Sequence, residues 1–153
     1  MDYLPEPDIF HDIAGHVPMH TDKAFAETLV RFGECAYTAA ELVAAVKDEE
    51  QRVKRLTSIF KGMARFFWFT VEFGLIREGG EVKVYGSGLI SSHGDAANAL
   101  GPRCDRRPFT LDAVLAQPFE IDHLQDVLFV IDSFDQLFGA LGDAERWLGR
   151  APH

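Results

Sequence analysis

One carboxylate inside an apolar segment constrains this chain more than any other feature. Glu72 interrupts the run from Phe66 to Ile76, in which nearly every other residue is apolar. A charged carboxylate drawn into such surroundings costs several kcal/mol unless a cation meets it. Arg65 is one candidate, but it lies two helical turns away, about 10 Å along the axis, and is poorly placed for contact. A metal ion is the more economical partner for Glu72.

Two histidines near the start of the chain offer further ligands. His11 and His16 stand five residues apart in the segment His-Asp-Ile-Ala-Gly-His. On an ideal α-helix this spacing places the two rings about 140° apart, so they converge on one ion only where the helix is ending. We therefore expect a short helix from Asp8 that ends at Gly15 and Pro18.

The residue types indicate which metals fit. Two histidines and one carboxylate with open positions form the arrangement of non-haem iron oxygenases, and zinc accepts the same ligand types. Trp68 and Phe69 precede Glu72 by four and three residues and share its face on a helix. They would form a wall on which an aromatic substrate stacks, although spacing alone favours a packed core face.

Composition indicates a globular protein with a small-molecule ligand. The 153 residues suit one domain, with 47% hydrophobic and 25% charged residues. A net charge of −9 argues against nucleic acid as a partner. No apolar run reaches membrane-spanning length, and no secretory signal is visible. Cys35 and Cys104 match no disulfide framework or zinc motif, so we expect free thiols and a cytoplasmic location.

Helical periodicity dominates, so we expect a mainly α fold with a small β component. A helix capped by Thr21 or Asp22 is predicted to stop at Gly33. The capping box 38–41 is predicted to begin the next helix, with Gly62 as a candidate break.

Shorter elements are expected in the second half of the chain. Val82 and Val84 predict a strand after a turn at 77–81, and residues 127–131 predict another. The glycine-rich stretch 85–95 is expected to be a loop, and a capping box at Ser133 is expected to begin the last helix.

Four segments resemble one known family, the pterin-dependent aromatic amino acid hydroxylases, with bacterial phenylalanine 4-monooxygenases as the closest branch. Residues 3–18 are similar to its iron-binding signature, and residues 68–75 to the segment that carries its carboxylate ligand. Residues 85–92 are similar to its substrate loop and residues 130–134 to a later segment. The shared order makes the four together far more specific than any one of them.

The resemblance implies a role for individual residues. It makes His11, His16 and Glu72 the iron ligands. The positions that it places near the pterin are Asp12, Ala64 and Phe67. The positions that it places around the amino acid site or behind the first histidine are Pro7, Trp68, Phe73, Gly88 and Ser91. Of all these, the resemblance implies a part in catalysis for Asp12, Trp68 and Ser91.

The implied activity is hydroxylation of an aromatic amino acid by oxygen, iron(II) and a tetrahydropterin, with phenylalanine to tyrosine as the leading case. Phe67 departs from the tyrosine often found there. The chain also begins almost at the iron motif, without the segment that grips the pterin and supplies an arginine for the substrate carboxylate. We therefore expect an aromatic amino acid hydroxylase-like catalytic fold, N-terminally shortened, with residues 1–153 as a single partial or minimal iron-binding domain.

Two alternatives stay open. The first is a zinc-dependent hydrolase that uses the same three ligands. The second is a shortened non-catalytic member that binds an aromatic amino acid or assembles with a partner. The oligomeric state and the preferred aromatic amino acid are not determined by the sequence.

Overall fold

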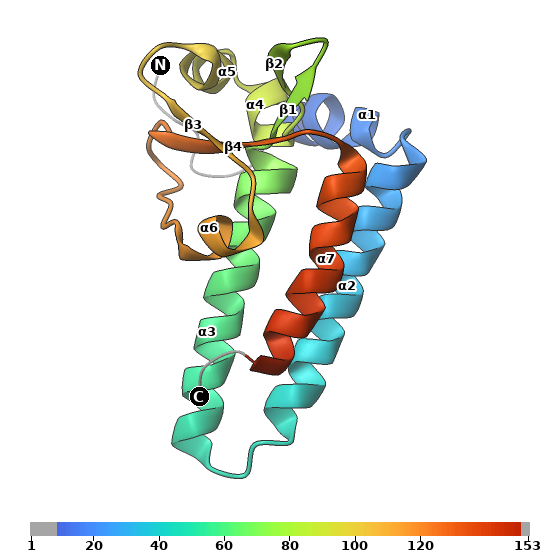
Figure 1. The fold of residues 1–153 in the computed structure, drawn as a ribbon, viewed down its shortest axis with the longest axis vertical. Helices are drawn as coiled ribbons and strands as arrows, with labels where there is room; N and C mark the ends of the chain where they lie inside the picture. Colours follow the sequence, from blue (N-terminus) through green and yellow to red (C-terminus); the bar gives the residue numbers. More distant parts are fainter. Residues whose placement is uncertain (1–8, 151–153) are drawn as a thin grey trace.

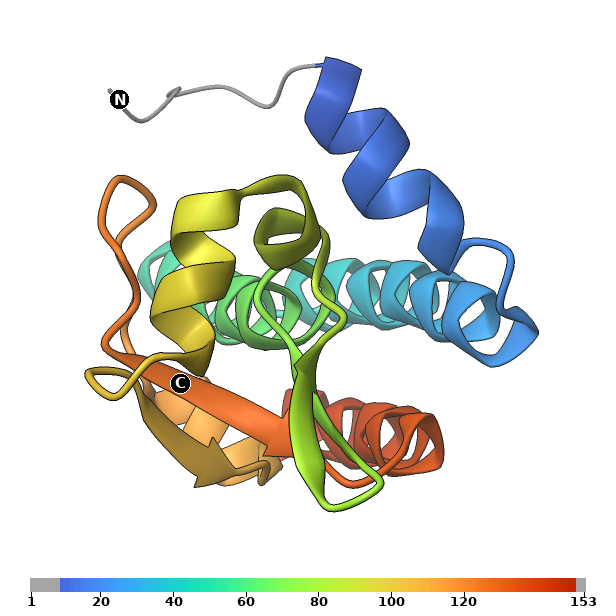
Figure 2. The ribbon, with the colours of Figure 1, turned by 90° about the horizontal axis from the view of Figure 1, so that it is seen from above.

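Three long helices and a small sheet make up residues 9–150, the part of the chain that this computed structural model describes. Helices α2 (Lys23–Ala44), α3 (Glu49–Phe67) and α7 (Phe134–Arg150) run alongside one another (Figure 1). The sheet and the short helices gather at one end of them, as the view from above also shows (Figure 2). The predicted mainly α fold with a small β component is confirmed. Among these residues no helix is both long and apolar enough to cross a bilayer.

Helix α2 is longer than predicted. Asp22 caps it by accepting a hydrogen bond from the Phe25 amide at 2.9 Å, as expected. The predicted stop at Gly33 and the new start at 38–41 are wrong. Buried side chains continue at helical spacing across the predicted break, so packing outweighs the local signals: Phe32, Cys35, Ala39 and Val43.

Helix α3 begins where Asp48 accepts a hydrogen bond from the Gln51 amide at 2.8 Å. Gly62 does not break it. A Cβ atom at Gly62 would lie 2.4 Å from Cη2 of Trp147 in α7. The glycine therefore serves close helix packing rather than a bend.

The sheet has four strands in the order β2-β1-β4-β3. Strands β1 (Leu75–Glu78) and β2 (Glu81–Val84) form an antiparallel hairpin, and β4 (Val127–Ile131) pairs in parallel with both β1 and β3 (Asp105–Pro108). Gly79 and Gly80 form the hairpin turn with φ of 62° and 84°, which few other residues tolerate. The predicted strands around Val82 and at 127–131 are confirmed, and the short helix α6 (Leu111–Ala116) connects β3 to β4.

The stretch 85–95 is not the predicted loop. It contains helix α4 (Ser87–Ser91) and the start of helix α5 (His93–Leu100). A Cβ at Gly86 would lie 2.4 Å from the Glu72 carbonyl oxygen, and one at Gly88 would lie 3.0 Å from the Phe73 ring. These glycines mark close backbone contact rather than flexibility.

Both cysteines are free, as expected, and both are buried. Burial raises the pKa of the Cys35 thiol to about 11. Because the thiolate is the reactive form, we predict that alkylation of Cys35 at pH 8 is at least ~100-fold slower in the folded protein than in the unfolded chain. Mass spectrometry after timed iodoacetamide pulses, with and without urea, measures the two rates. Equal rates would contradict the prediction.

Candidate metal centre

Three side chains from distant parts of the sequence meet at one point. The Nε2 atoms of His11 and His16 lie 3.1 Å apart. Glu72 Oε1 lies 3.4 Å from His16 Nε2, and Glu72 Oε2 lies 3.6 Å from His11 Nε2. Two atoms that bind one ion at right angles, each at about 2.1 Å, are about 3.0 Å apart. The three distances between the predicted ligands, 3.1, 3.4 and 3.6 Å, are therefore close to that spacing and slightly longer.

The two histidines converge because their segment is a π-helix. Element η1 (His11–His16) is wound with the wider π-helical turn, and α1 (Val17–Met19) continues it. Backbone bonds in a π-helix join residues five apart, so those residues lie one above the other. The helix does not end at Gly15 and Pro18, so the predicted reason for convergence is wrong although the convergence itself occurs. Pro18 is the second residue of α1, and the helix continues past it to Met19.

Glu72 also ends a π-helical turn. Element η2 (Trp68–Glu72) follows α3, and the Phe73 amide donates to the Trp68 carbonyl, five residues back, at 2.8 Å. The Glu72 side chain is only 15% exposed. Arg65 is not its cation, because the guanidinium donates to the Leu115 carbonyl at 2.7 Å.

Two hydroxyl groups of helix α4, those of Ser87 and Ser91, form hydrogen bonds with two of the three candidate ligands. Ser91 Oγ lies 2.8 Å from His11 Nδ1 and donates to the Ser87 carbonyl at 2.8 Å. Because a carbonyl only accepts, Ser91 uses its proton there and accepts the Nδ1 hydrogen of His11. The Nε2 lone pair of His11 is thereby directed into the site. Ser87 Oγ donates to Glu72 Oε2 at 2.8 Å.

The β1–β2 hairpin explains why α4 reaches Glu72. Leu75 pairs with Val84 in the hairpin register. Continuing that register outward by three residues places Ser87 opposite Glu72. The amides of Tyr85 and Gly86 both donate to the Gly74 carbonyl, which keeps the two chains together beyond the strands.

The aromatic neighbours of Glu72 divide between two environments. Trp68 is stacked between Phe73 and Phe119, each with its ring centre 4.5 Å away, and its Nε1 donates to Gln125 at 3.3 Å. Phe69 is 1% exposed and packs edge-on against Phe129. In a π-helical turn the residue three positions before Glu72 turns away, so Phe69 belongs to the core rather than to the predicted wall.

Comparisons with known proteins identify the family of this chain. A sequence model for the biopterin-dependent aromatic amino acid hydroxylases matches residues 1–146. The chain belongs to this family. Phenylalanine-4-hydroxylase of Caulobacter vibrioides is 41% identical over 138 residues, which cover 90% of this chain and 42% of that protein. Tyrosine 3-monooxygenase of Drosophila melanogaster is 31% identical over 146 residues, 95% of this chain and 22% of that protein.

Solved structures of hydroxylases confirm the fold. Phenylalanine hydroxylase from Legionella pneumophila has a TM-score of 0.77 at 32% identity, with 98% of this chain and 54% of that chain covered. The Chromobacterium violaceum enzyme with bound iron(III) and 7,8-dihydrobiopterin has a TM-score of 0.76 at 34% identity, with 98% and 50% covered. The chain thus spans about half the length of those solved chains, and 22–42% of the two curated relatives named above.

The remaining described residues that the sequence singled out lie on η1, α3 and α4. Asp12 is exposed on η1, and Ala64 is exposed on α3. Phe67 is partly buried and meets the Phe32 ring edge-on, with 5.7 Å between ring centres. Gly88 lies on α4 beside the Phe73 ring. Pro7 lies outside the described residues.

Sequence reasoning missed the contacts that hold these residues. Ser87, which donates to Glu72, was not singled out, and neither were Phe119 and Gln125, which hold Trp68. The only local signal for Ser87 is its position four residues before Ser91, which places both hydroxyls on one helix face. That signal is usable only if the stretch is known to be helical.

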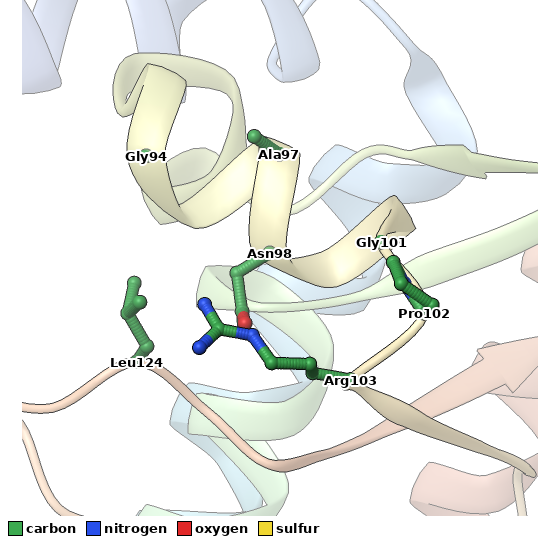
Figure 3. A pocket seen from close by; sticks show the side chains of 7 residues that line it. All are labelled: Gly94, Ala97, Asn98, Gly101, Pro102, Arg103 and Leu124. Carbon is green, nitrogen blue, oxygen red and sulfur yellow. The ribbon is translucent and has the colours of Figure 1, made fainter.

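Two other features of the described surface include none of the three candidate ligands. Glu120, Asp122 and His123 also come close enough to share an ion, but all three are exposed. A surface pocket lies between α5 and the loop that carries Leu124 (Figure 3). None of the residues predicted for the site lines it: Gly94, Ala97, Asn98, Gly101, Pro102, Arg103 and Leu124.

Proposed function

We propose that this chain carries the iron(II) site of a tetrahydropterin-dependent monooxygenase that hydroxylates an aromatic amino acid, with phenylalanine to tyrosine as the leading reaction. The observation that carries the proposal is the convergence of His11, His16 and Glu72. A Chromobacterium violaceum relative with iron and dihydrobiopterin supports the cofactors, and one with iron and phenylalanine supports the substrate class. Since those chains are about twice as long, the activity of the whole enzyme is part of the proposal.

His11, His16 and Glu72 are the residues that would hold the metal. Two neutral imidazoles and one carboxylate suit iron(II) and leave coordination positions open. Bound there, iron(II) with a tetrahydropterin would supply the activation of oxygen that ring hydroxylation needs. Ser91 keeps the His11 ring in the tautomer whose Nε2 lone pair faces the site.

The remaining roles are assigned by position in the family motifs. We assign Asp12, Ala64 and Phe67 to the pterin side. Asp12 and Ala64 are exposed there, which leaves them open to a ligand. We assign the amino acid side to Pro7, Trp68, Phe73, Gly88 and Ser91. Phe73 and Phe119 stack on the indole of Trp68 and fix its orientation, which makes this aromatic cluster rigid.

Turnover with defined metals tests the proposal. Metal-free protein is loaded anaerobically with iron(II) or with zinc, and then mixed with oxygen, a tetrahydropterin and phenylalanine, tyrosine or tryptophan. We expect hydroxylated amino acid only when iron(II) and pterin are both present, at least an order of magnitude above the zinc-loaded control. Chromatography of the amino acid products measures it.

Two results would replace the proposal by its alternatives. Hydrolytic activity with zinc and no hydroxylation with iron(II) would support the zinc-dependent hydrolase. Stoichiometric iron and measurable binding of an aromatic amino acid, without any hydroxylated product, would support the shortened non-catalytic member.

A further inference from the structure

We propose that Ser87 is a positioning residue of the metal centre, whose hydroxyl fixes the Glu72 carboxylate for metal binding. This inference rests on the proposed function, because it concerns the same three ligands. The resemblance to the family motifs assigns no role to Ser87, so this inference adds a residue to the site.

The contacts of Ser87 carry the inference. The residue is 1% exposed, and its Oγ donates to Glu72 Oε2 at 2.8 Å. The Val71 carbonyl is a second acceptor, but at 3.3 Å it is more distant. A hydrogen bond to an ionised carboxylate is shorter and about twice as strong as one to a neutral acceptor. The carboxylate is therefore the main partner of this hydroxyl, and no bulk water competes for it.

The hydrogen bond distinguishes the two oxygens of Glu72. Oε2 accepts the hydrogen bond from Ser87 and lies 3.6 Å from His11 Nε2, whereas Oε1 lies closer to the other histidine, 3.4 Å from His16 Nε2. A carboxylate held at one oxygen offers the other to a metal, and binding through one oxygen leaves more of the coordination sphere free for reactants. The hydroxyl also lowers the entropy that Glu72 would lose on binding.

Helix α4 acts on two ligands at once. Ser87 holds Glu72 from the first residue of the helix, and Ser91 holds His11 from the last. The two serines are linked, because Ser91 donates to the Ser87 carbonyl at 2.8 Å. One helical turn thus aligns a carboxylate from η2 with an imidazole from η1.

The test compares Ser87→Ala with Thr28→Val. Thr28 is also buried, but its hydroxyl donates to the Ala24 carbonyl within α2, so the control removes a buried hydroxyl without touching a ligand. Cobalt(II) serves as the probe, since its visible absorption reports both affinity and coordination. We expect Ser87→Ala to weaken cobalt binding by about 10- to 100-fold and to change the spectrum of the bound ion. Thr28→Val should leave both unchanged.

Three outcomes separate this inference from the proposed function. If wild-type protein binds neither cobalt(II) nor iron(II), both proposals fall together. If wild-type protein binds metal and Ser87→Ala binds it equally well with the same spectrum, only the role of Ser87 falls. A lower melting temperature of metal-free Ser87→Ala with unchanged cobalt affinity likewise assigns Ser87 a merely structural role and overturns the inference.

Discussion

Replacing Glu72 by alanine is expected to lower the affinity for iron(II) by at least ~100-fold and to abolish hydroxylation. Sites with four protein ligands bind zinc with about 10–16 kcal/mol, so each ligand contributes on the order of 3 kcal/mol. Glu72 supplies one of three ligands and the only negative charge among them. Its loss also leaves the Ser87 hydroxyl without its carboxylate partner. Metal analysis after gel filtration and a cobalt(II) titration measure the loss.

Asp122→Ala is the matched control for Glu72→Ala. It removes one carboxylate beside a histidine, in the exposed group of Glu120, Asp122 and His123. Exposed charges of this kind contribute little to binding or stability, so iron content and melting temperature should match wild-type protein. If Glu72→Ala keeps stoichiometric iron, or if Asp122→Ala loses as much, the three-ligand centre is wrong.

The position of Glu72 beside two histidines was predictable because it depends on a local energetic conflict. A carboxylate among the phenyl and indole rings of residues 66–76 needs a cation or a hydrogen-bond donor beside it in any fold that buries this segment. The convergence of His11 and His16 was predicted correctly, but for the wrong reason. Both ligand segments are π-helical, and the preference for a π-turn arises from packing that neighbouring residues do not reveal.

The misinterpretation of 85–95 has a different physical cause. Glycines permit both flexible turns and close approach of two backbones, and sequence alone does not distinguish the two uses. Gly86 and Gly88 serve the second use, because the backbone of Glu72 lies against them. That neighbour is set by the register of the β1–β2 hairpin, a contact between segments that sequence reasoning treated separately. Ser87 was missed for the same reason.

Gly15→Ala is expected to destabilise the fold and weaken metal binding, although alanine favours helices more than glycine does. A Cβ at Gly15 would lie 2.6 Å from the Ser87 carbonyl oxygen, which is a backbone atom and cannot rotate away. To admit it, η1 must move away from α4. Since η1 carries both histidines while α4 holds Glu72 through Ser87, that movement separates the ligands.

The expected loss of stability in Gly15→Ala follows from overpacking, which lowers the free energy of unfolding by about 1–3 kcal/mol. We expect cobalt(II) affinity to fall by at least ~10-fold, because the ligands must then be drawn together at the expense of that packing. Gly33→Ala is the control, since nothing lies within 4 Å of a Cβ at this position inside α2. There the same substitution should stabilise by about 0.5–1 kcal/mol and leave metal affinity unchanged. Urea unfolding and cobalt titration measure both variants. If the two substitutions change stability in the same direction, close contact between η1 and α4 does not determine the geometry of the metal centre.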